Sequence, residues 1–147
     1  MSAFLDTSAL VPVFLSDQPH HAASMKIFVR CKPQWASCAS HSLAEVYSTL
    51  TRLPAPHRAT PDQAVRCLHN IVSQCRLISL DGEEYLSVIQ NAASSKVSGG
   101  TIYDALIAAC ARKAGAGQIY TWNSRHFAQF GPDVANRLIA PDSLIES

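Results

Sequence analysis

Charged side chains are scarce in this sequence, and neither sign is in excess. Asp, Glu, Lys and Arg make up 16% of the 147 residues, against 48% hydrophobic residues, and the formal net charge is +1. So few charges among so many apolar residues argue against a disordered chain and favour one well-packed domain over residues 1–147. A nearly neutral chain has no overall attraction for nucleic acid, so any site for a polyanion must be a local patch.

Several sequence motifs are also missing. The chain has no Gly-x-Ser-x-Gly of serine hydrolases, no P-loop and no Gly-x-Gly-x-x-Gly fingerprint. The five cysteines are odd in number and form no Cys-x-x-Cys pair, which argues against a disulfide framework and favours a reducing compartment. No apolar run is long enough to span a bilayer, and the N-terminus lacks the pattern of a signal peptide. We therefore expect a cytoplasmic protein without a membrane association.

Short apolar segments alternate with longer amphipathic ones along the chain. The apolar segments predict strands at 3–5, 35–39, 77–80, 118–121 and 137–140. The longer segments predict helices at 18–29, at 42–53, from 61 onward, at 82–94 and at 101–114, with Thr60 and Asp81 as N-caps. Strands that alternate with helices in this way predict an α/β fold, in which a parallel sheet is covered on both faces.

Polar residues follow two of the predicted strands. Asp6 comes directly after the first strand, and Thr121, Trp122 and Asn123 lie at the end of the fourth. In an open parallel sheet, the ligand site lies at the carboxyl ends of the strands. The topology therefore places both segments at the same edge of the sheet.

Three acidic residues lie among apolar or small residues, with no Lys or Arg within one helical turn. They are Asp6, Glu45 and Asp104. A carboxylate that is taken out of water needs a compensating partner, and the nearby sequence offers no cation. One divalent ion shared by the three would satisfy this need, because Mg²⁺ prefers oxygen ligands of this kind. We therefore predict that the three acids meet in space as a metal site.

Each acid also has an explanation that needs no metal. Asp6 fits an N-cap for a helix that follows the first strand, and Ser42-x-x-Glu45 and Thr101-x-x-Asp104 fit the capping-box pattern. Helical phase places Glu45 opposite the apolar stripe of its helix, where it lines a cleft or faces solvent. Asp104 begins a helix that is apolar nearly all round, so another group must lie close against it. The sequence leaves these alternatives open.

Other side chains are weaker candidates for contact with a substrate. Trp122 fits packing better than stacking on a base, and His41 fits a cap or surface position better than a catalytic base. Solvated surface charge is the default explanation for four basic residues that are also candidates for a phosphate-binding rim: Arg52, Arg112, Lys113 and Arg125.

Four segments together resemble the PIN-domain ribonucleases, and especially the VapC-like toxins of type II toxin–antitoxin pairs. The matching segments are Phe4–Leu10, Ser42–Val46, Gly100–Ala109 and Ile119–Phe127. One segment alone is a weak match, but the four occur in the family order over nearly the whole chain. The resemblance implies a three-layer α/β/α sandwich with a central parallel sheet. It also implies an RNA-cleaving site that depends on Mg²⁺, with Mn²⁺ as a substitute.

The resemblance also suggests roles for individual residues. Asp6, Glu45 and Asp104 match three of the acidic metal-site positions of the family. A fourth acid usually follows the Thr of the fourth strand, but Asn123 stands there, and His126 occupies a nearby position that is often acidic. An amide oxygen can bind a metal ion or position its water, yet it adds no negative charge, which weakens the case for a second metal. Asn123 therefore joins the three acids as a candidate catalytic residue.

These expectations together describe a metal-dependent endoribonuclease that is the toxin of a toxin–antitoxin pair. RNA would be the substrate, a cognate antitoxin the protein partner, and a homodimer the oligomer that the resemblance implies. One alternative is a housekeeping PIN nuclease that processes RNA without an antitoxin. Another is a non-catalytic PIN scaffold that binds RNA or protein, which the missing fourth acid would suit.

Overall fold

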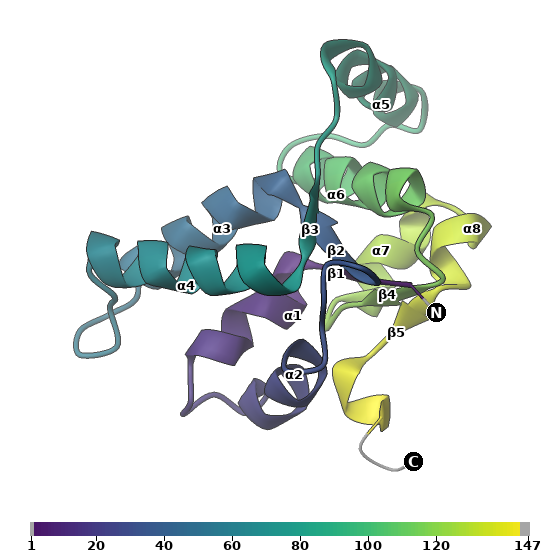
Figure 1. Cartoon of the computed structure of the whole chain (residues 1–147). Coiled ribbons are helices and arrows are strands. Elements are labelled where there is room, and N and C mark those ends of the chain that lie inside the picture. Colours follow the sequence, from purple (N-terminus) through teal and green to yellow (C-terminus); the bar gives the residue numbers. More distant parts are fainter. Residues whose placement is uncertain (1, 145–147) are drawn as a thin grey trace.

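The computed structural model describes residues 2–144 and has a five-stranded parallel sheet at its centre (Figure 1). The strands are β1 (Ala3–Leu5), β2 (Ala36–Ala39), β3 (Arg76–Ile78), β4 (Gln118–Tyr120) and β5 (Leu138–Ile139). Their order in the sheet is β3-β2-β1-β4-β5, so the first strand lies in the middle. Phe4 is in register with Ser37 on one side and with Ile119 on the other. All five predicted strands are present, with small differences at their ends.

Within the described residues, five helices of eight or more residues lie in the connections between the first four strands. They are α2 (His21–Phe28), α3 (Ser40–Thr51), α4 (Pro61–Gln74), α5 (Gly82–Ser94) and α6 (Thr101–Ala114). The remaining helices are single turns: α1 (Thr7–Leu10), η1 (Val11–Phe14), α7 (Ser124–Phe127), η2 (Ala128–Phe130), α8 (Pro132–Ala135) and η3 (Pro141–Leu144). The sequence predicts the long helices, and two of them are shifted or shortened at their ends. Within residues 2–144, every helix falls short of the length and hydrophobicity that crossing a membrane requires.

Thr60 and Asp81 cap two of the long helices, as predicted, and each is part of a capping box that the sequence analysis does not predict. The Thr60 hydroxyl accepts a hydrogen bond from the backbone N–H of Gln63, and the Gln63 side chain accepts one from the N–H of Thr60. Asp81 and Glu84 form the same reciprocal pair at the start of α5. These bonds satisfy backbone donors that the first helical turn leaves without partners.

The two capping boxes considered for the candidate acids are not formed. Helix α3 begins at Ser40, so Ser42 already lies inside the helix and cannot cap it. Helix α6 begins at Thr101 itself, and its start has no side-chain cap. The carboxylates of Glu45 and Asp104 are therefore free of the capping role and available for other partners.

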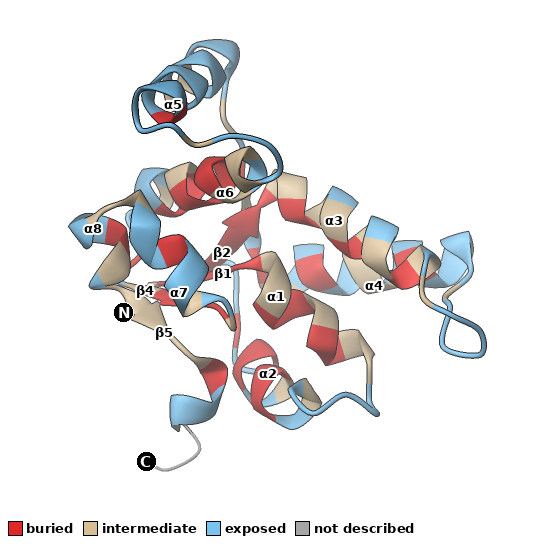
Figure 2. Ribbon diagram, turned by 180° about the vertical axis from the view of Figure 1, so that it is seen from behind, coloured by how far each residue is buried: buried red, intermediate tan, exposed pale blue. Residues whose placement is uncertain are grey.

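Helices cover both faces of the sheet. Side chains of Ala3 and Leu5 pack against α1, α2, α3 and α4, while Phe4 packs with α6, α7 and α8 on the opposite face, because neighbouring residues of a strand point to opposite sides. Helix α5 packs on α6 rather than on the sheet, and most of its residues are exposed (Figures 1 and 2). The arrangement is the predicted three-layer α/β/α sandwich, in which the carboxyl ends of β1, β2 and β4 share one edge.

Candidate functional site

Asp6 is almost fully buried at the carboxyl end of the central strand, with 2% of its surface exposed. It caps α1 by accepting a hydrogen bond from the backbone N–H of Ser8 on Oδ2, at 3.2 Å. The hydroxyls of Ser8 and Thr121 donate to the same oxygen, at 2.7 and 2.8 Å. Oδ1 accepts none of these three bonds. The capping role of Asp6 therefore engages Oδ2.

The hydroxyls that hold Asp6 also tie the first strand to the fourth. The Ser8 hydroxyl accepts a hydrogen bond from the backbone N–H of Trp122, and the Thr121 hydroxyl accepts one from the N–H of Asn123, both at 2.9 Å. Each hydroxyl therefore donates to Asp6 and accepts from the segment after β4, which fixes its orientation. This network places the segment that carries Asn123 beside the buried carboxylate.

Thr7 connects Glu45 to the same segment. Glu45 projects from α3, and its Oε1 accepts a hydrogen bond of 2.7 Å from the Thr7 hydroxyl. Its Oε2 lies 4.0 Å from Nε2 of His41, which is too far for a hydrogen bond. Because Thr7 directly follows Asp6, the Thr7 bond brings the carboxylates of Glu45 and Asp6 to one region.

Asp104 faces these two acids from the first turn of α6. Burial raises the pKa of its carboxyl, nearby His126 opposes that rise, and the charges of Asp6 and Glu45 add to it. Nε2 of His126 lies 2.9 Å from Oδ2 of Asp104. His126 is therefore a group that lies close against Asp104, as the apolar helix around Asp104 predicts. The three predicted acids are near enough for their charges to repel one another.

The carboxylates form a donor set that fits a hard divalent cation. Within residues 2–144, none of the three acids forms an ion pair with Lys or Arg. Burial raises the pKa of Asp6 despite hydrogen bonds from Ser8 and Thr121, so its charge is also costly. In the described part of the chain, no three or more His, Cys, Asp or Glu side chains converge closely enough to hold an ion by themselves. Any divalent ion at these acids would therefore have to be held partly through water molecules, as Mg²⁺ commonly is.

Two hollows adjoin the acids. The larger, of about 580 Å³, is lined by Asp104, Asn123 and His126 among others. The smaller, of about 380 Å³, is lined by Thr7, Glu45 and Tyr103 among others. Tyr103 and Asp104 are neighbours in sequence and line one hollow each, so the first turn of α6 borders both hollows.

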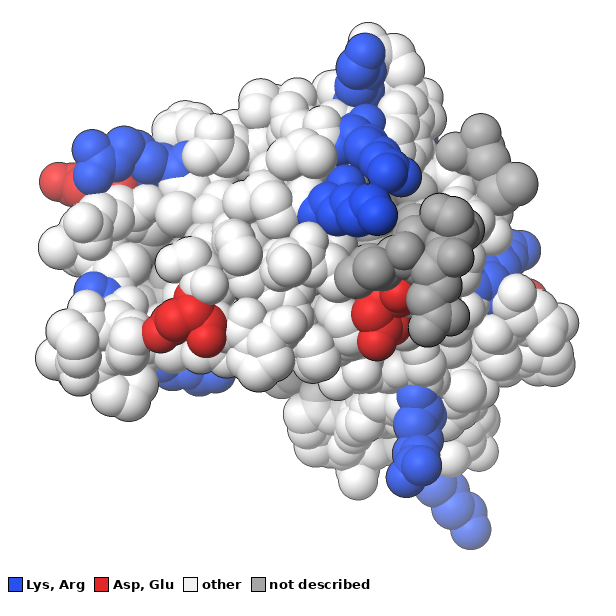
Figure 3. Space-filling model, turned by 90° about the horizontal axis from the view of Figure 1, so that it is seen from below, with Lys and Arg blue, Asp and Glu red and all other residues white. Residues whose placement is uncertain are grey.

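Two of the four basic residues considered for a phosphate-binding rim lie in these hollows. Arg125 lines the larger hollow and Arg52 the smaller. Arg112 and Lys113 instead form ion pairs away from the acids, each with an N–O distance of 2.7 Å. On the face of the molecule shown in Figure 3, most side chains are uncharged and the charged ones lie in small separate groups. The basic residues that the two hollows offer to a phosphate chain are therefore Arg52 and Arg125.

The aromatic residues at the site differ in how well they are covered. The Trp122 ring stacks on His20 with 3.6 Å between ring centroids, and its Nε1 donates to the Ser24 hydroxyl at 2.9 Å. Packing against His20 and Ser24 therefore accounts for the position of the Trp122 side chain, which is the explanation that the sequence favours. Tyr103, which the helical pattern places among buried residues, is 50% exposed, and its ring lies parallel to that of His41 at 5.5 Å. In the sequence, the one signal that points to Tyr103 is its position directly before a candidate acid.

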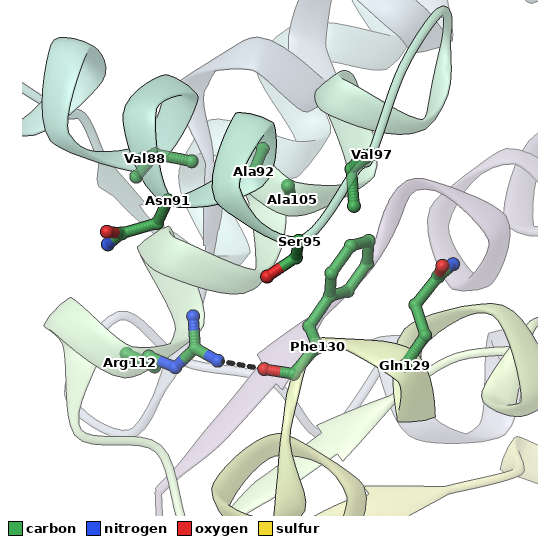
Figure 4. Close-up of a pocket in the computed structure, with 9 residues that line it drawn as sticks. All are labelled: Val88, Asn91, Ala92, Ser95, Val97, Ala105, Arg112, Gln129 and Phe130. Atoms are coloured by element: carbon green, nitrogen blue, oxygen red, sulfur yellow. Dashed lines mark hydrogen bonds between the residues drawn. The ribbon is translucent and has the colours of Figure 1, made fainter.

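A third hollow, of about 440 Å³, lies between α5, α6 and η2 (Figure 4). Its lining is mostly uncharged, and its one charged residue, Arg112, donates to the carbonyl of Phe130 and pairs with Asp133. None of the three candidate acids lines this hollow, so it adds nothing to the site.

Comparison with known proteins gives consistent results. Residues 3–131 match the model of the PIN domain family. Ribonuclease VapC40 of Mycobacterium tuberculosis is 37% identical over 111 residues, which cover 76% of this chain and 79% of VapC40. Ribonuclease VapC27 of the same species is 35% identical over 107 residues, which cover 73% of this chain and 74% of VapC27.

Solved structures resemble this chain in fold. The crystal structure of VapC20 of Mycobacterium tuberculosis, a sarcin-ricin loop cleaving toxin, has a TM-score of 0.69 at 19% identity. The match covers 87% of this chain and 95% of VapC20. DNA-bound VapBC from Salmonella typhimurium has a TM-score of 0.65 at 17% identity, covering 96% of this chain and 98% of that chain. At these identities the structures support the three-layer fold alone.

The raised pKa of Asp104 predicts how its amide variant behaves without metal. Because the pKa is higher in the folded than in the unfolded chain, ionisation of Asp104 costs stability once the pH exceeds the unfolded value. We expect Asp104→Asn to raise the Tm of the metal-free protein near pH 7. The gain should vanish below pH ~4, where the carboxyl is protonated in both states.

Thermal unfolding in EDTA, followed by circular dichroism, measures the difference in Tm between Asp104→Asn and the wild type. Measurements between pH ~3 and ~8 cover the range in which a carboxyl group titrates. Asp142→Asn is the matched control, because Asp142 is exposed and outside the site. A lower Tm for Asp104→Asn at neutral pH would contradict this prediction, because it would show that ionised Asp104 stabilises the folded protein.

Proposed function

The chain belongs to the PIN-domain family, and from this premise we propose that it is a metal-dependent endoribonuclease and the toxin of a toxin–antitoxin pair. The observation that carries the proposal is the meeting of Asp6, Glu45 and Asp104 at one edge of the sheet, without a Lys or Arg partner in residues 2–144. The names of the relatives VapC40 and VapC27, both ribonucleases, support RNA as the substrate.

Mg²⁺, with Mn²⁺ as a substitute, is the proposed cofactor. Asp6, Glu45 and Asp104 would hold the ion, partly through water molecules. When bound, the ion supplies a water of lowered pKa and stabilises the charge that grows on the phosphate oxygens. No protein nucleophile is then needed.

The chain's own side chains keep the proposed ligands in place. Ser8 and Thr121 hold Oδ2 of Asp6, which leaves Oδ1 for the ion. Thr7 holds Oε1 of Glu45, so that carboxylate cannot swing freely into solvent. Hydroxyls suit this task because they orient a carboxylate without neutralising its charge.

Asn123 and two arginines are the proposed contacts with RNA. Asn123 lines the same hollow as Asp104, where its amide can orient a water molecule or a phosphate oxygen. Arg125 in that hollow and Arg52 in the adjoining one would bind phosphates on either side of the acids. An RNA strand would then cross the acids with its scissile phosphate between the two hollows.

Two observations favour this function over its alternatives. The relatives named VapC favour a toxin over a housekeeping nuclease. The three carboxylates lie close enough to repel one another, which is unfavourable for the folded protein. Such a grouping is typical of catalytic sites and favours an enzyme over a scaffold that merely binds RNA or protein.

An antitoxin is the proposed protein partner. Solved structures with a similar fold include VapBC from Rickettsia felis and from Salmonella typhimurium. The acids of this chain would attract a basic side chain of the partner for the same reason that they attract a metal ion. An Arg guanidinium suits the position, because its planar fork can bridge two carboxylates.

Three further features belong to the proposal. We infer a homodimer from the family alone. A cytoplasmic location is supported by the five cysteines, which are all free thiols. The single domain over residues 1–147 includes residues 1 and 145–147, which lie outside the described residues.

Cleavage of RNA should require a divalent metal. We expect EDTA to abolish cleavage and Mg²⁺ or Mn²⁺ to restore it. Asp104→Asn should lower kcat by more than a hundredfold, because changes even beyond the metal ligands of such sites cost roughly 10–100-fold. Gel analysis of a labelled RNA measures both effects, and cleavage that persists in chelator would refute the mechanism.

Asn123 gives a direct test of the metal environment. Asn123→Asp should tighten Mn²⁺ binding by about tenfold or more, because it adds a negative charge in a partly dry cleft. Isothermal titration calorimetry measures the affinity. Asn70→Asp is the control, since it adds the same charge at an exposed position on α4. Equal affinity of wild type and Asn123→Asp would place the Asn123 side chain outside the reach of the ion.

Toxicity and its relief test the proposed partner. Induced expression should arrest growth, and co-expression of the adjacent upstream gene product should restore it by forming a complex with little nuclease activity. Substituting the inserted Arg of the partner should restore cleavage more than it weakens the complex. A stable complex that cleaves RNA at the full rate would contradict inhibition at the acids.

A further inference from the structure

Tyr103 exposes a large aromatic surface directly beside a proposed metal ligand. It is the third residue of α6 and is 50% exposed, whereas the four residues after Asp104, Ala105–Ala108, are buried. Packing of the helix on the sheet therefore does not account for this side chain. An aromatic ring left open next to a charged cleft is a feature that a ligand can use.

The rings of Trp122 and Tyr103 each lie beside a histidine ring, and the two pairs differ in how closely the rings approach. His20 and Trp122 are in close contact, with ring centroids 3.6 Å apart and planes inclined by 14°. His41 and Tyr103 are more nearly parallel, at 8°, yet their centroids are 5.5 Å apart. At this centroid distance the two rings are offset or apart, so His41 covers at most part of one face of the Tyr103 ring. With half of its surface exposed, Tyr103 keeps open aromatic surface, whereas Trp122 has His20 against one face and its Nε1 bonded to Ser24.

The hollow beside Tyr103 has the chemistry of a nucleotide site. It measures about 380 Å³, and its lining includes Arg52 and two residues with hydroxyl groups, Ser48 and Thr49. A guanidinium binds phosphate, hydroxyls bond to base edges or ribose, and an aromatic ring stacks on a base. Glu45, a proposed metal ligand, lines the same hollow, so a nucleotide bound there would lie next to the metal.

We propose that this hollow binds one unpaired nucleotide of the RNA substrate, with its base stacked on Tyr103 and its phosphate directed to Arg52. The proposal rests on the ribonuclease function and adds to it the means by which the substrate is selected. A base within a duplex cannot reach the ring, whereas a base in a loop or a single strand can be turned out and stacked. The site therefore selects unpaired RNA.

Two single-stranded oligomers of equal length, one with bases and one without, test directly whether a base stacks on Tyr103. The first probe is a single-stranded RNA about twelve nucleotides long, and the second is an abasic ribose-phosphate oligomer of the same length. Binding is measured in Ca²⁺, in place of Mg²⁺, so that cleavage does not intervene. The variants are Tyr103→Ala, Tyr103→Phe and Arg52→Ala, with Tyr85→Ala as the matched control because Tyr85 is an exposed tyrosine on α5.

We expect Tyr103→Ala to weaken RNA binding by about tenfold and to leave binding of the abasic oligomer unchanged. Tyr103→Phe should bind RNA like the wild type, since the ring remains. Arg52→Ala should weaken binding of both oligomers, because phosphate is common to both. Tyr85→Ala should change neither.

Several results would overturn the stacking proposal alone. One is an equal loss of affinity for RNA and for the abasic oligomer in Tyr103→Ala. Another is unchanged RNA binding in Tyr103→Ala together with weaker binding of the antitoxin, which would assign the ring to a protein partner. Wild-type protein that binds no RNA would overturn the ribonuclease proposal as well, so the two failures can be told apart.

Discussion

The buried carboxylate of Asp6 is the constraint on which the rest of the site depends. It lies at the carboxyl end of the central strand, where burial raises its pKa and makes its charge costly. The hydroxyls of Ser8 and Thr121 meet that cost in part, and in doing so they bind the first strand to the segment after the fourth. The next residue, Thr7, holds Glu45. The hydrogen-bonding needs of this short segment therefore position most of the proposed site.

Charge balance connects the metal, the RNA and the partner. Three carboxylates that lack Lys or Arg partners within residues 2–144 favour any cation that can enter the cleft. A hydrated metal ion and the guanidinium of a partner satisfy the same demand, so the proposed cofactor and inhibitor compete for one place. The arginines of the chain itself, Arg52 and Arg125, stand in the flanking hollows, where they can attract phosphate without neutralising the acids. A chain of net charge +1 can bind RNA in this way only locally.

The sequence predicts the layers of the fold and the edge of the sheet that bears the site, because strands and long helices have clear periodic patterns. It also singles out the three acids, since carboxylates among apolar residues are conspicuous. The sequence cannot show which of the three acids caps a helix. In the structure Asp6 is both an N-cap and a proposed metal ligand, while Glu45 and Asp104 are not caps. The exposure of Tyr103 and the ion pair of Arg112 depend on elements distant in sequence, which local periodicity does not reveal.

Anomalous X-ray diffraction from crystals soaked in Mn²⁺ tests the central claim most directly, because it locates the ion independently of any activity. The account predicts one anomalous peak between the carboxylates of Asp6, Glu45 and Asp104, at a distance that allows direct or water-mediated contact, and its loss in Asp104→Asn. A protein that cleaves RNA in Mn²⁺ but shows no peak at these carboxylates, or a peak elsewhere, would contradict the account.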